Sequence, residues 1–125
     1  MDDKLPAGKT TKQILLVTRV NLLHDLILAN AGYSVITVRS IAEARRAWQP
    51  GRYALVLISA LDTTREAEEF CEELKSIYPP QSVALLTGWN TFLPKDSCPD
   101  ETISREEGPA MFVSRVKEML AKPSS

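Results

Sequence analysis

Five polar residues could do chemistry together, because each one follows closely on a short apolar run. They are Thr18, Arg19, Ser59, Thr87 and Arg105. Hydroxyl groups donate and accept hydrogen bonds, and a guanidinium is a permanent cation that attracts anions. The set contains no carboxylate, the group by which proteins usually hold Mg²⁺, and no base beside the serine, so we expect neither a metal site nor a catalytic residue.

The apolar runs that precede these residues alternate with helical patterns. Strands are predicted over 14–17, 33–38, 54–58 and 83–87, with a short strand near 102–103. Helices are predicted from Asn21 to Gly32, from Ser40 to Trp48, from Thr63 to Tyr78 and from Gly108-Pro109 onward. Ser40 with Glu43, and Thr63 with Glu66, have the spacing of capping boxes.

Three of the helices have an apolar face that helical spacing defines. In the helix from Thr63 to Tyr78 the residues at this spacing are Ala67, Phe70, Cys71, Leu74, Ile77 and Tyr78. In the first helix the expected inward residues are Leu22, Leu23, Leu26 and Ile27, and His24 is expected to face solvent. In the last helix they are Phe112, Val113, Val116 and Leu120.

The segment after the fourth strand differs from the other crossovers. Residues 88–100 contain Pro94 and Pro99 and show no helical face, so the fourth helix is expected to be shortened or missing. The same segment contains Trp89, Phe92 and Leu93. These side chains could anchor a partner, or they could fold back and cover the sheet where a helix is lacking.

Strands that alternate with helices predict an α/β fold, a flavodoxin-like doubly wound five-stranded parallel sheet. The site in such a fold lies at the carboxyl ends of the strands. That is the edge at which the five polar residues stand.

Composition adds limits on the class of protein. The chain of 125 residues is 44% hydrophobic, which suits one domain over 13–122 between tails at 1–12 and 123–125. A net charge of -1 gives no reason to expect a nucleic acid or a membrane as partner. The absence of a leader-like start predicts a cytoplasmic protein with reduced thiols. Cys71 reads as a buried thiol, and it could bridge to Cys98 only if the fold brought the two together.

From Lys12 to Lys122 the chain resembles a bacterial response-regulator receiver domain of two-component signal transduction. The resemblance lies in element order and in Ile14-Leu15-Leu16-Val17, Ala31-Gly32-Tyr33 and Leu85-Leu86-Thr87. It implies an acidic pair after the first strand, a phosphate-accepting aspartate after the third, Thr or Ser after the fourth and Lys after the fifth. Only Thr87 matches.

The departures from the family pattern imply a pseudo-receiver. Thr18 and Arg19 replace the acidic pair, Ser59 replaces the aspartate, and Ser104-Arg105 is the nearest counterpart of the lysine. Arg19 would repel a divalent cation, and phosphorylation at this site should fail. Asp62 is the nearest carboxylate, and a turn or cap role is the first interpretation of it.

Two functions from different classes remain. The first is a signalling module that binds a protein partner without phosphorylation, with a homodimer as the family's implication and with no cofactor. The alternative is a switch that binds an anion or metabolite through Arg19, Ser59, Thr87 and Arg105. A receiver that uses Asp62 as acceptor comes third. No motif of another enzyme class is present, so the chain is not expected to be an enzyme.

Overall fold

The computed structural model describes residues 13–18, 23–59, 64–87, 98–104 and 108–121. Within them, five strands form one parallel sheet in the order β2-β1-β3-β4-β5. The strands are β1 (Gln13–Val17), β2 (Ser34–Val38), β3 (Tyr53–Ser59), β4 (Val83–Thr87) and β5 (Glu101–Ser104). The expectation of a flavodoxin-like sheet is confirmed.

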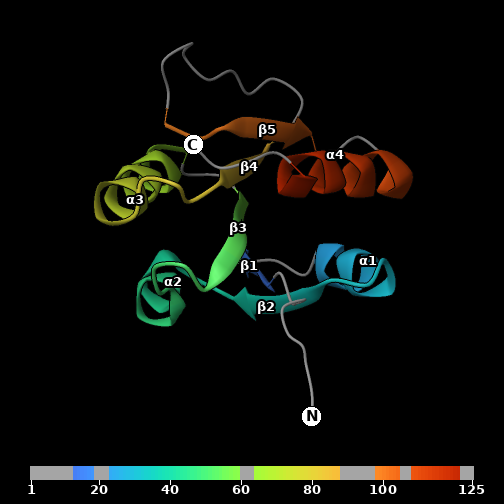
Figure 1. The fold of residues 1–125 in the computed structure, drawn as a ribbon, viewed down its shortest axis with the longest axis horizontal. Coiled ribbons are helices and arrows are strands. Elements are labelled where there is room, and N and C mark those ends of the chain that lie inside the picture. The colour runs from blue at the N-terminus through green and yellow to red at the C-terminus, as the bar shows by residue number, and fades with distance from the viewer. Residues whose placement is uncertain (1–12, 19–22, 60–63, 88–97, 105–107, 122–125) are drawn as a thin grey trace.

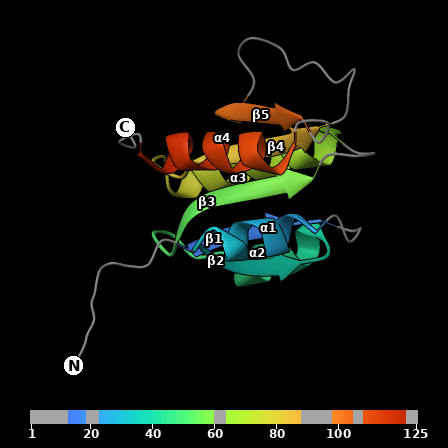
Figure 2. The same cartoon turned by 90° about the vertical axis from the view of Figure 1, so that its right-hand side faces the viewer.

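The described residues contain four helices, which cover both faces of the sheet. They are α1 (His24–Asn30), α2 (Ile41–Ala47), α3 (Thr64–Ile77) and α4 (Pro109–Ala121). Helices α1 and α4 lie on one face, and α2 and α3 lie on the other (Figure 1). Figure 2 looks onto the sheet from the side of α1 and α4, and the strand arrows point in the same direction. No helix in the described ranges is long and apolar enough to span a membrane.

The crossover between β4 and β5 is described only at its end. Residues 98–100 are bends rather than helix. Residues 88–97, on which most of the expectation of a shortened or missing helix rests, lie outside the described residues.

The sheet separates two hydrophobic cores, because successive side chains of a strand point to opposite faces. Leu15, Val17, Val56 and Ile58 pack with Phe70 and its neighbours under α2 and α3. The alternate residues of the same strands pack under α1 and α4, among them Ile14, Leu16, Leu55, Leu57 and Phe112. Both faces of β1 and β3 are therefore buried, as their continuous apolar runs predict.

The apolar face predicted for α1 is right only at Ile27, which packs against the core on this side of the sheet, and Leu22 lies outside the described residues. The helix begins at His24, and Leu28 is its buried residue, while Leu23 and Leu26 are more than half exposed. His24 packs edge-on against Phe112 of α4 with the ring centroids 4.6 Å apart. The expectation that His24 faces solvent is therefore wrong. His24 and Leu28 are one helical turn apart and share the inner face of the helix, which packs toward α4 and the sheet.

The inner face of α4 is mostly as predicted. Phe112 and Val116 are buried, and Val113 and Leu120 are partly buried. Met119 is also buried, although it was not predicted to face inward. The spacing of 112, 116 and 119 follows the helical repeat, so Met119 continues the central line of the face and Leu120 lies at its edge.

A buried glutamine joins three elements at the amino ends of β3 and β4. Gln81 is only 2% exposed, and its Oε1 accepts a hydrogen bond of 2.8 Å from Trp48 Nε1, just after α2. Its Nε2 donates to the carbonyl oxygens of Tyr53 and Ser82, both at 3.1 Å. The oxygen and the nitrogen of this amide therefore both have hydrogen-bond partners. Burying the polar side chain then costs little free energy.

Candidate functional site

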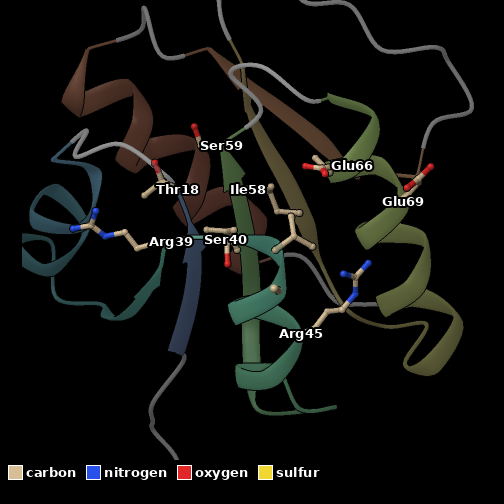
Figure 3. A pocket seen from close by; sticks show the side chains of 12 residues that line it. Thr18, Arg39, Ser40, Arg45, Ile58, Ser59, Glu66 and Glu69 are labelled. Carbon is tan, nitrogen blue, oxygen red and sulfur yellow. The ribbon is translucent and has the colours of Figure 1, made fainter.

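The carboxyl edge of the sheet presents hydroxyl side chains from four strands. Thr18 directly follows β1, and Ser59, Thr87 and Ser104 are the last residues of β3, β4 and β5. Val17 is paired with Ile58, so the next residues, Thr18 and Ser59, are neighbours, as Figure 3 shows. Thr87 and Ser104 are register partners. The strand-end placement predicted from the sequence is confirmed for these residues.

What distinguishes Ser59 from Thr18 at this edge is hydrogen bonding and not burial. Thr18 and Thr87 are both nearly buried, and the Thr18 N–H donates to Val38 O at 3.0 Å. The Oγ atom of Ser59 is buried and has no hydrogen-bond partner among the described residues. A buried hydroxyl without a partner costs about 1–3 kcal/mol. The end of β3 is therefore a place where the described structure leaves a hydrogen bond unmade.

A cavity of about 380 Å³ opens beside Ser59 between α2 and α3. Its floor is formed by the ends of β1 and β3, and its walls by the start of α2 and the first two turns of α3 (Figure 3). The lining residues are Val17, Thr18, Arg39, Ser40, Ile41, Ala42, Arg45, Ile58, Ser59, Glu66, Ala67 and Glu69. The volume is at the lower end of the range for small-molecule pockets.

A capping box fixes the α2 wall of the cavity. The Glu43 N–H donates to Ser40 Oγ at 3.1 Å, as predicted for the cap. The Glu43 carboxylate accepts from the Arg39 N–H at 2.8 Å, one residue before the position that a standard capping box uses. This reciprocal pair holds Arg39 and Ser40 at the cavity mouth.

The two walls carry opposite charges. Arg45 extends from α2 toward α3 (Figure 3). Its Nε donates to both carboxylate oxygens of Glu73 at 3.0 Å. This hydrogen bond raises the pKa of Arg45 above its ordinary value. Glu66 and Glu69 line the α3 wall, and Arg39 on the other side points away from α3. The cavity is thus polar with mixed charge, not a purely cationic anion site.

The predicted site residues are only partly brought together. Thr18 and Ser59 share the cavity, and Thr87, although at the same edge, is not among its lining residues. Arg19 and Arg105 lie outside the described residues, as does Asp62. The predicted interaction residues Trp89, Phe92 and Leu93 also lie outside them.

Four of the residues that line the cavity are not predicted as site residues from the sequence, namely Arg39, Arg45, Glu66 and Glu69. A signal was available, because Arg39 precedes the Ser40 cap and Glu66 completes the second predicted capping box, so both stand at helix starts above strand ends. Their convergence, however, depends on α2 and α3 covering the same face of the sheet. That is a property of the strand order and not of either helix.

Among the residues that the structure describes, the donor set at this edge does not fit Mg²⁺. Mg²⁺ is ordinarily held by one or two carboxylates together with water or phosphate oxygens. The described strand ends offer the hydroxyls of Thr18, Ser59 and Thr87 in their place. Within the described ranges, no three His, Cys, Asp or Glu side chains gather into a group that could hold a metal ion.

The chain is similar to known proteins in structure, but its sequence matches no known family. No protein-family model matches the chain, and no curated protein matches it. A CheY-like receiver domain protein from Methanospirillum hungatei superposes with a TM-score of 0.76 at 20% identity, over 89% of this chain and 94% of that one. The receiver domain of a signal transduction histidine kinase from Syntrophus aciditrophicus gives 0.73 at 25% identity, over 89% and 91%.

A third structure is the response regulator TrrA from Thermotoga maritima, in complex with Mg²⁺ and BeF. It gives a TM-score of 0.74 at 22% identity, over 87% of this chain and 99% of that one. Each of these three superpositions covers nearly the whole of this chain and of the chain that it is compared with. The chain therefore has the fold of the receiver domains of response regulators.

Proposed function

We propose that this protein is a non-catalytic signalling module that binds a protein partner without being phosphorylated at the end of β3. The observation that carries the proposal is Ser59, the residue with which β3 ends. Resemblance to the receiver family puts the phosphate-accepting aspartate at this position. The proposed setting is the cytoplasm of a bacterium, with the homodimer that the family implies as one form of the partner.

The chemistry of the edge supports independence from phosphorylation. A receiver aspartate supplies both a nucleophilic oxygen and a ligand for the metal that neutralises charge on the phosphoryl group. The Ser59 hydroxyl is a weak nucleophile, and Thr18 stands beside it where a carboxylate would assist. Arg19, next along the chain, adds a positive charge that opposes binding of a divalent cation.

The test is thermal unfolding of the purified protein with Mg²⁺ and beryllium fluoride, which mimics a phosphoryl group. We expect no change in Tm, because a ligand that does not bind the folded state cannot stabilise it. A clear increase in Tm for the wild type would overturn the proposal and direct attention to Asp62 as the acceptor.

A matched pair of variants makes a negative result informative. Arg19→Asp with Ser59→Asp restores carboxylates after β1 and β3, and we expect Mg²⁺ with beryllium fluoride to raise its Tm by several degrees. Arg19→Asn with Ser59→Asn has similar shape without the charges and should show no increase. A response in both double variants would show that the carboxylates are not what the wild type lacks.

A second candidate, the ligand-binding switch, is favoured by the cavity beside Ser59. An unpaired buried hydroxyl next to opposed Arg and Glu walls suits a small molecule that bears both a negative and a positive group. Melts with inorganic phosphate, with dicarboxylates and with free amino acids test it. Stabilisation by one of these that is lost in both Ser59→Ala and Arg45→Ala would favour the switch over the interaction module.

A further inference from the structure

Two cysteines that are far apart in the sequence meet where α3 passes the start of β5. Cys71 in α3 is fully buried, and Cys98, three residues before β5, is partly exposed. Both are free thiols, and their Sγ atoms are 2.7 Å apart. The two sulfur atoms are therefore in direct contact, although the distance is longer than the roughly 2.05 Å of a disulfide bond.

The backbone around Cys98 is fixed by hydrogen bonds to two elements. Asp100 donates its N–H to Val83 O at 2.9 Å and accepts the Val83 N–H on Oδ2 at 2.9 Å. Its other carboxylate oxygen accepts from Lys75 Nζ at 2.7 Å. Lys75 is one helical turn beyond Cys71 on the same face of α3. The bonds of Asp100 therefore keep Cys98 against Cys71.

We propose that Cys71 and Cys98 are a redox modification site, which a small-molecule disulfide such as glutathione disulfide converts into an intramolecular disulfide bond. The product joins α3 covalently to the segment that leads into β5. The bond is reversible, because an excess of the small thiol returns both cysteines to the reduced form.

The reaction proceeds by two exchanges. The Cys98 thiolate attacks one sulfur of the small disulfide, forms a mixed disulfide and expels one small thiolate, which takes up a proton. The Cys71 thiolate then attacks Cys98 Sγ and expels the second. Two protein thiols and one small disulfide become one protein disulfide and two small thiols, so hydrogen atoms and electrons balance.

Burial determines the order of the two exchanges. Cys98 is the thiol that a reagent in solution can reach. Burial raises the pKa of Cys71 above its ordinary value, which lowers the fraction of thiolate at this residue. Cys71 therefore reacts second, with a sulfur that is already beside it.

The experiment treats the full chain with glutathione disulfide or with a reducing agent, then alkylates free thiols and measures the intact mass. After oxidation we expect no alkylation, no glutathione adduct and a mass lower by two hydrogen atoms. The closed loop restrains the unfolded chain, so Tm without reductant should rise by roughly 10 °C. Persistent glutathione on Cys98, or two alkylated cysteines, would overturn the proposal.

Variants separate the pair from its surroundings. Cys98→Ser should show no Tm response to oxidation, and Cys71→Ala should accumulate the glutathione adduct because the second exchange is removed. Asp100→Ala should lower the ratio of oxidised to reduced protein severalfold at a fixed glutathione ratio, since the segment is no longer held in place. Glu118→Ala, an exposed carboxylate change on α4, is the control and should leave this ratio unchanged. An Asp100→Ala ratio equal to that of Glu118→Ala would remove the positioning role of Asp100.

Discussion

The two ends of β3 treat buried polar side chains in opposite ways. At the amino ends of β3 and β4, the Gln81 amide is buried and bonded to Trp48, Tyr53 and Ser82. At the carboxyl end of β3, the Ser59 hydroxyl is buried and has no partner among the described residues. Folding alone favours the first arrangement, because buried polar groups are generally paired. We therefore interpret the Gln81 amide and its three partners as a structural joint between elements. We interpret the carboxyl end of β3, with its unpaired hydroxyl, as the end that is available for function.

The largest effect that this comparison predicts is the loss of stability when the Gln81 amide is removed. Gln81→Leu leaves the Trp48 Nε1–H and the Tyr53 carbonyl without that partner inside the core. We expect the free energy of unfolding to fall by about 2–4 kcal/mol, measured by urea denaturation. Gln49→Leu, at an exposed turn position, is the control and should change it by less than about 0.5 kcal/mol. An equally small decrease in the free energy of unfolding for Gln81→Leu would contradict the structural role of the Gln81 amide.

A smaller effect is expected when only the donor of that joint is removed. Trp48→Phe keeps an aromatic ring in the core but removes the Nε1–H that bonds Gln81. The free energy of unfolding should fall by about 1–2 kcal/mol, because one buried acceptor loses its partner. Combined with Gln81→Leu, the two losses should be less than additive, since both remove the same hydrogen bond. Full additivity would mean that the bond contributes nothing.

The smallest effect is predicted at the other end of the sheet. Ser59→Ala removes a hydroxyl that makes no hydrogen bond with the described residues, so the free energy of unfolding should stay within about 0.5 kcal/mol of wild type or rise. The same urea measurement checks it. A loss above about 1 kcal/mol would show that Ser59 is bonded after all, and the contrast between the two ends would disappear.

The sheet and its strand ends could be predicted from the sequence because they depend on local patterns. Continuous apolar runs that end on Ser59 and Thr87 identified β3 and β4 almost to the residue. The α1 register could not be read in this way, since Leu22, Leu23, Leu26 and Ile27 make a convincing apolar face by themselves. The choice of His24 and Leu28 as the inner residues depends on contact with α4.

The site could be predicted less well than the fold. Strand-end rules found Thr18 and Ser59, but the opposed walls of Arg45 and Glu69 form only when α2 and α3 lie side by side. The contact between Cys71 and Cys98 could not be predicted either, because no local sequence pattern around one cysteine indicates that the other lies beside it in the fold. Gln81 shows the same limit, because a polar residue before a strand looks like an ordinary loop residue until three elements surround it.

The alternation of side chains along β1 and β3 has a consequence for how this protein can change over evolutionary time. Each strand residue belongs to one core only, so the layer of α1 and α4 meets the layer of α2 and α3 chiefly through the backbone of the sheet. Substitutions that repack one layer leave the side-chain contacts of the other untouched. The helices that border the cavity and carry Cys71 can therefore diverge while the opposite layer continues to secure the fold.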